Sequence, residues 1–157
     1  MFPIPWYVVI FESIPEALLL QILTIKLMNK KKVSFCKLLK VSMLYGVAAF
    51  FIRNIAFHLG QHFLFSLHTI LLILVLALLF DLIHKIKFSR SFIPLFIVSV
   101  LFGLIQYTFV LIIFNLYKLN IYTFQESPWL NITLFIPVAG ITYSIVCIYT
   151  KYAGEIR

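Results

Sequence analysis

The chain has 157 residues, of which 63% are hydrophobic and 11% are charged, and its mean hydropathy is +1.08. Soluble domains carry about 45–50% apolar and about 25% charged residues, so this composition excludes an ordinary water-soluble protein. A formal net charge of +8 would suggest nucleic acid in a soluble chain. Here the basic residues gather between apolar runs, where they indicate topology and contacts with anionic lipid headgroups. We therefore predict a protein whose partner is the lipid bilayer and not nucleic acid.

Five apolar runs follow one another along the chain, each long enough to cross a bilayer, since a span needs about 20 apolar residues. They cover residues 3–28, 38–59, 65–83, 92–117 and 129–149. The spans and their short connections use up the length, which leaves no room for a soluble catalytic domain. The prediction is one all-α membrane domain over residues 1–157, an integral membrane helix bundle of about five transmembrane helices.

The basic residues predict how this bundle lies in the membrane. They are concentrated in residues 30–40, in residues 84–90 and in the tail, and they are almost absent from the other two connections. By the positive-inside rule, the N-terminus is outside, the C-terminus is cytoplasmic, and the protein is a multi-pass protein of the cell membrane. A re-entrant first segment would reduce the count to four spans. Cys36 and Cys147 both fall on the predicted cytoplasmic side, and no disulfide is expected there.

The first apolar run contains two carboxylates, Glu12 and Glu16, within the stretch FESIPEALLLQ. A charge in the membrane costs at least about 2.5–3.5 kcal/mol on insertion scales, so such a residue usually faces a partner, a cavity or a pathway. The two residues are four apart and share a helix face, where two ionised carboxylates would repel each other. Pro15 lies between them and predicts a kink in the span.

Arg53 in the second span matches Glu12 in depth, which predicts an ion pair between them and leaves Glu16 without a partner of opposite charge. Two interpretations stay open. The pair is structural and fixes the packing of spans one and two, or the polar cluster responds to a small ligand or a proton that enters from outside. In the structural interpretation Glu16 is protonated or hydrogen-bonded to one of three side chains: Gln21, Asn54 or Gln106.

Histidines surround the predicted external turn after the second span. His58 and His62 have the spacing of two metal ligands on one helical face, but Gly60 between them favours a helix end, so no metal site is expected. His68 joins the predicted polar site, where a pH-sensing role is open because imidazole titrates near neutrality. Asp81, near the cytoplasmic end of the third span, is expected to reach the surface among neighbouring lysines.

The stretch Glu12-Ser13-Ile14-Pro15-Glu16, the lone Arg53 late in the second span, and the stretch Phe65-Ser66-Leu67-His68-Thr69-Ile70 together resemble one family. They are similar to the N-terminal membrane sensor domains of Gram-positive bacterial GHKL-type sensor histidine kinases, and to stand-alone relatives that lack the kinase. The resemblance implies that the domain receives an extracellular or membrane-borne signal and passes it through its last helix. Because the sequence stops at Arg157, the expectation is a stand-alone relative with a separate kinase or response partner on the cytoplasmic side, or a truncated gene product.

The sequence thus predicts a non-catalytic sensory or regulatory module, part of a bacterial two-component system by its resemblance. Its ligand-binding or switch residues are Glu12, Glu16, Arg53 and His68, with a structural kink at Pro15. No cofactor is expected, and no nucleophile–base pair, phosphate-binding glycine loop or HExxH motif is present. The alternative is a small transport or permeability component that uses the Glu12 and Glu16 carboxylates as a proton or cation path.

Overall fold

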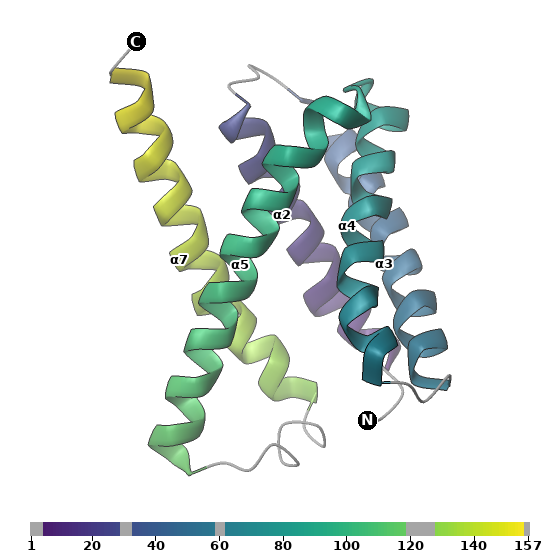
Figure 1. Ribbon diagram of the computed structural model, residues 1–157, viewed down its shortest axis with the longest axis vertical. Coiled ribbons are helices and arrows are strands. Elements are labelled where there is room, and N and C mark those ends of the chain that lie inside the picture. Colours follow the sequence, from purple (N-terminus) through teal and green to yellow (C-terminus); the bar gives the residue numbers. More distant parts are fainter. Residues whose placement is uncertain (1–4, 29–32, 59–61, 119–127, 156–157) are drawn as a thin grey trace.

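The computed structural model is all-helical, and long helices run from one end of the molecule to the other (Figure 1). It describes residues 5–28, 33–58, 62–118 and 128–155, and these residues contain no strand. The first long helix has three parts, α1 (Trp6–Val8), the π-helical η1 (Val9–Ser13) and α2 (Ile14–Leu27). The others are α3 (Phe35–His58), α4 (His62–His84), α5 (Phe88–Tyr117) and α7 (Pro128–Glu155).

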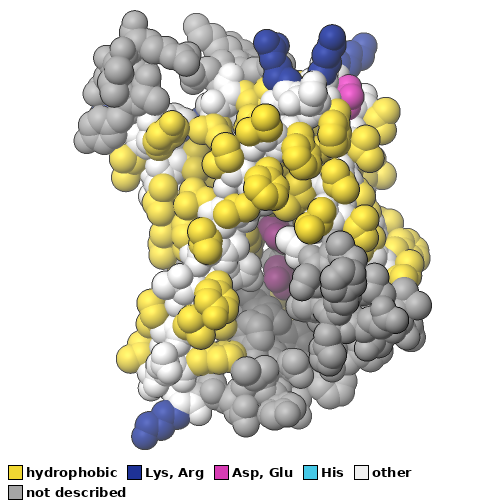
Figure 2. All heavy atoms as spheres, in the orientation of Figure 1, with side chains coloured by type: hydrophobic (Ala, Val, Ile, Leu, Met, Phe, Trp, Pro, Cys, Tyr) yellow, Lys and Arg dark blue, Asp and Glu magenta, His cyan; other side chains and the backbone are white. Residues whose placement is uncertain are grey.

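Four segments are long and apolar enough to cross a membrane: Trp6–Leu27, Phe35–Ile55, Phe88–Leu116 and Ile132–Lys151. In α4 the apolar stretch His68–His84 is shorter, although the 23 residues of the helix would extend about 35 Å at 1.5 Å per residue. The prediction of an all-α membrane bundle is confirmed. Figure 2 shows the same character on the surface, with hydrophobic side chains over the middle of the face and Lys and Arg side chains toward its ends.

One end of the bundle is strongly basic. There α3 begins and α4 and α7 end, and several basic side chains of the described residues are exposed. We call this the basic end; among the described residues it includes Lys37, Lys40, Lys85, Lys87, Arg90 and Lys151. The first helix begins at the opposite end, so α1 and the last turn of α7 lie at opposite ends of the molecule (Figure 1).

The first helix occupies the middle of the bundle. Its apolar window is 44% buried, against 11% for α5, and α2 packs against α3, α5 and α7. The core surrounds its buried face, because a helix hides its apolar side chains by packing against its neighbours. The largest fully buried apolar side chains of this core are Phe80, Leu23, Leu76, Leu95, Val41, Val98 and Val138. Any polar group on the same face of α2 is therefore held inside the bundle.

Candidate functional site

Glu12 lies in a π-helical turn, Val9–Ser13, that directly precedes α2. Pro15 follows in the first turn of α2. A proline inside a helix lacks the N–H that would bond to the carbonyl four residues earlier, and its ring crowds that carbonyl. A wider turn is one way to relieve this, and π-turns occur frequently at functional sites. The irregularity predicted at Pro15 therefore takes the form of a π-turn that contains Glu12, a feature that sequence reasoning missed.

Gly46 brings α3 unusually close to this turn. A Cβ at Gly46 would lie 2.8 Å from Cγ1 of Ile14 and 3.1 Å from Cγ1 of Val9. Small residues let membrane helices approach closely in this way. Three buried residues of the first helix, Ser13, Ala17 and Gln21, lie four residues apart on one face. Polar groups from the two helices consequently meet at short range.

The structure forms an ion pair between Arg53 and Glu16, and the charge of Arg53 also acts on the nearby Glu12. Nη2 of Arg53 lies 3.7 Å from Oε2 of Glu16, and the two side chains are only 17% and 18% exposed. Nη1 of Arg53 also donates a hydrogen bond of 3.4 Å to the Ser13 hydroxyl. The prediction that Glu16 has no partner of opposite charge is therefore wrong, and the close contact of Arg53 is with Glu16, one turn beyond the predicted Glu12.

The physical reason lies in the direction of side chains on a helix. They tilt toward the N-terminus of their own helix, and α3 runs antiparallel to α2. The N-terminus of α3 lies at the basic end, so the Arg53 side chain points toward that end. It therefore contacts Glu16, which lies one helical turn closer to the basic end than Glu12. Matching the depths of the backbone positions ignores this displacement.

The Arg53 cluster, which we define as Glu12, Ser13, Glu16 and Arg53, is incompletely paired. Hydrogen bonds between a guanidinium and a carboxylate usually measure about 2.7–2.9 Å, so the 3.7 Å contact is a loose ion pair. Nε of Arg53 is buried and has no hydrogen-bond partner among the described residues. With both carboxylates ionised, the cluster would hold two negative charges and one positive charge. Figure 2 shows acidic side chains set back in a hollow of the apolar face, away from the basic end.

His68 is the remaining predicted site residue, and the other histidines of the predicted external turn are His58 and His62. His68 lies on α4, and the contact described for it is with the neighbouring Thr69 hydroxyl, at 3.4 Å from Nε2. The side chains of His58 and His62 lie outside those that the structure describes. Where side chains are described, there is no group of three or more His, Cys, Asp or Glu that could hold a metal ion.

A second polar group joins three helices nearer the basic end. Nε2 of Gln21, on α2, lies 2.7 Å from the Ser42 hydroxyl, 3.3 Å from the Leu38 carbonyl and 3.1 Å from the Ala17 carbonyl. Its Oε1 is 3.2 Å from Nε2 of His84, at the end of α4. We call Gln21, Ser42 and His84 the Gln21 knot. Gln21 was one candidate partner for Glu16, but its described contacts run to these other groups.

Helix α7 contacts the first helix near both of its ends. Trp129 stacks on Tyr7, with ring centroids 5.3 Å apart, and lies 6.0 Å from the ring of Phe11. Near the basic end, Nζ of Lys26 lies 2.7 Å from Sγ of Cys147 and 5.5 Å from the centre of the Tyr143 ring. A displacement of the first helix would therefore change its contacts with α7 at two separate places, at Trp129 and at Cys147.

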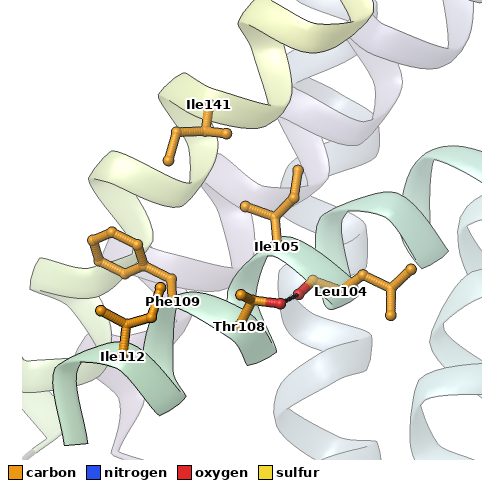
Figure 3. A pocket seen from close by; sticks show the side chains of 6 residues that line it. All are labelled: Leu104, Ile105, Thr108, Phe109, Ile112 and Ile141. Atoms are coloured by element: carbon orange, nitrogen blue, oxygen red, sulfur yellow. Dashed lines mark hydrogen bonds between the residues drawn. The ribbon is translucent and has the colours of Figure 1, made fainter. Parts of the chain in front are cut away.

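An apolar pocket of about 290 Å³ lies between α5 and α7 (Figure 3). Its one hydroxyl, on Thr108, donates to the Leu104 carbonyl at 2.8 Å. The lining offers no charged group, so it suits a hydrocarbon chain and no acid–base chemistry. The lining residues are Leu104, Ile105, Thr108, Phe109, Ile112 and Ile141.

Comparison of the chain with protein-family models, with curated proteins and with solved structures gives no match in any of the three.

Proposed function

We propose that this chain is a non-enzymatic sensory or regulatory module of the cell membrane, with the Arg53 cluster as its input. The observation that carries the proposal is the loose, largely buried Glu16–Arg53 pair beside a π-turn. Ionisable residues inside a membrane are costly and commonly mark functional sites. A buried ion pair is also weak evidence for a stabilising role, because desolvation can exceed the attraction between the charges.

The cluster responds by changing its charge balance. A proton on Glu16, or a small ligand that competes for Arg53, removes part of the attraction between α2 and α3. The weaker attraction changes the packing at the π-turn, because α3 lies closely against this turn at Gly46. A ligand acts here only if it binds the two arrangements of the helices with different affinity.

The output passes through α7, which contacts the first helix through Trp129 and again through Cys147. The end of α7 lies at the basic end, which we assign to the cytoplasm from its lysines and arginines. The resemblance to the membrane domains of sensor histidine kinases favours a separate kinase or response protein as the partner there. In this proposal the signal reaches the Arg53 cluster from outside or from the bilayer.

Intrinsic fluorescence tests the input, because the chain has two tryptophans, Trp6 and Trp129, and Trp129 packs on η1 through Phe11. In lipid nanodiscs, Glu16→Gln should shift the tryptophan emission relative to the native chain at the same pH. Asp81→Asn is the matched control, since it removes a carboxylate at the basic end. Trp6→Phe in each background assigns the shift to Trp129. Equal spectra for the native chain and Glu16→Gln would contradict coupling between the cluster and η1.

The alternative, a transport or permeability component, requires polar groups along a continuous path. The pocket between α5 and α7 is apolar, which gives such a path little support on that side. Liposomes that contain the purified protein and a pH gradient separate the two functions. We expect the gradient to decay at the same rate as in empty liposomes, whereas a faster decay that Glu16→Gln abolishes would favour the transport function.

A further inference from the structure

Lys26 and Cys147 form a pair of nucleophilic side chains outside the Arg53 cluster. Lys26 lies in the last turn of α2, and Cys147 is a half-buried free cysteine of α7. Nζ of Lys26 lies 2.7 Å from Sγ of Cys147, although 121 positions separate the residues in sequence. A lysine at the end of a span usually extends its ammonium group into water. Here the ammonium is directed at a sulfur atom on another helix.

The surroundings hold the lysine in this position. Nζ of Lys26 lies 5.5 Å from the centre of the Tyr143 ring, a distance at which a cation is attracted to an aromatic face. Tyr143 and Cys147 are four residues apart on α7, so they share one helix face. The amine is thus positioned to attack the sulfur once an oxidant has made that sulfur electrophilic, and such proximity raises the rates of intramolecular reactions.

We propose that Lys26 and Cys147 are a redox-modifiable site, at which a peroxide joins Sγ of Cys147 to Nζ of Lys26 and links α2 to α7 covalently. The inference is independent of the proposed sensory function, because it concerns the chemistry of this pair alone. Oxidised cysteines condense with thiols or with backbone nitrogens, and here the amine takes the place of the backbone nitrogen.

The reaction takes two balanced steps. The Cys147 sulfur attacks one oxygen of hydrogen peroxide, so the S–O bond forms, the O–O bond breaks, and the departing hydroxide leaves as water with the thiol proton. The product is a sulfenic acid. The neutral Lys26 amine then attacks this sulfur, the S–N bond forms, and the S–O bond breaks with loss of a second water. Peroxide is reduced by two electrons, and one S–H and one N–H bond are replaced by one S–N bond.

The test uses the full chain in nanodiscs with Cys36→Ser, which removes the exposed competing thiol. After treatment with hydrogen peroxide, proteolysis and mass spectrometry should find the peptides of Lys26 and Cys147 joined, with two hydrogen atoms lost. Dithiothreitol should separate them again. Because only the neutral amine is nucleophilic, the yield should rise as the pH is raised.

Lys26→Arg is the matched variant, because it keeps the cation and removes the nucleophilic amine. It should abolish the joined peptide completely, and dimedone should then capture the sulfenic acid on Cys147. The inference is overturned if the native pair yields only sulfenic or sulfinic acid on Cys147, if Cys147 instead forms a disulfide between chains, or if Cys147 does not react with peroxide. A joined peptide that persists in Lys26→Arg would also overturn it.

Discussion

The Gln21 knot and the Arg53 cluster both tie α2 to α3, but they do so in opposite ways. The knot is neutral when His84 is neutral, and its contacts measure 2.7–3.3 Å. Nδ1 of His84 is buried and, like Nε of Arg53, has no hydrogen-bond partner among the described residues, so the contrast lies in charge and in contact length. The Arg53 cluster is charged, its contacts measure 3.4 and 3.7 Å, and Nε of Arg53 lacks a partner among the described residues. Both groups include a residue from the same buried face of the first helix, Ser13 in the Arg53 cluster and Gln21 in the knot.

The difference separates a structural polar group from one that can change. Hydrogen bonds between membrane helices contribute about 0.6 kcal/mol on average, but a buried polar group that loses its partner costs about 1–3 kcal/mol. Removal of Gln21 would leave several groups unpartnered at once. In the Arg53 cluster Nε of Arg53 has no partner among the described residues, and two carboxylates face one guanidinium. A proton or a ligand that binds there therefore disrupts only weak contacts, those of Arg53 with Glu16 and Ser13.

Gln21→Ala should have the largest effect on stability. It opens a cavity in the core and leaves Ser42 and the Nε2 side of His84 without their partner, so the free energy of unfolding should fall by about 2–4 kcal/mol. Unfolding in mixed micelles with increasing denaturing detergent measures this. Gln106→Ala, at a half-buried glutamine of α5, should cost less than about 0.5 kcal/mol. Equal losses in the two variants would show that the knot has no special structural role.

Gly46→Ala tests whether close packing of α3 on the π-turn supports the Arg53 cluster. The new methyl group would press on Ile14 and Val9, both β-branched and stiff, and overpacking of this kind costs about 1–3 kcal/mol. Because α2 and α3 would move apart, the emission of Trp129 should also shift. Gly103→Ala is the control, since no atom lies within 4 Å of a Cβ there, and a helical Gly→Ala change can add up to about 1 kcal/mol. An unchanged stability and spectrum in Gly46→Ala would remove the packing argument.

The fold class was predictable because hydropathy alone encodes it. Apolar runs longer than a bilayer is thick leave few alternatives to helices, since backbone groups in lipid must be satisfied internally. The charged members of the candidate site were equally visible, because Glu12, Glu16 and Arg53 interrupt apolar runs. Composition and periodicity identify such residues without any knowledge of packing.

The partners were not predictable in the same way. The pairing of Arg53 with Glu16 depends on side-chain direction along antiparallel helices, which depth along the chain does not include. The π-turn at Glu12 depends on how the backbone accommodates Pro15. Gln21, Ser42 and His84 are separated in sequence, and they meet only because three helices are rotated to face one another. Neutral polar residues are common in spans, so the sequence offered Gln21 only as a candidate partner for Glu16 and did not connect it with Ser42 or His84.

Asp81 gives the smallest expected effect and sharpens the contrast between buried and exposed polar contacts at the basic end. Its Oδ2 accepts a 3.2 Å hydrogen bond from the backbone N–H of Phe88, the first residue of α5, and the side chain is exposed. Asp81→Ala should lower the free energy of unfolding by about 0.5–1 kcal/mol, as for loss of a helix cap. Asp81→Asn should change it little, because asparagine caps about as well as aspartate.

Hydrogen exchange of the first turn of α5 in nanodiscs gives the local measurement, and faster exchange is expected in Asp81→Ala alone. If Asp81→Ala lowered the free energy of unfolding as much as Gln21→Ala does, the location of a polar contact at the basic end, and not its burial, would determine how much it stabilises the protein. The contrast between the Gln21 knot and its exposed neighbour would then fail. A small, local loss instead places the stabilising polar contacts of this end inside the bundle, where water cannot replace a lost partner.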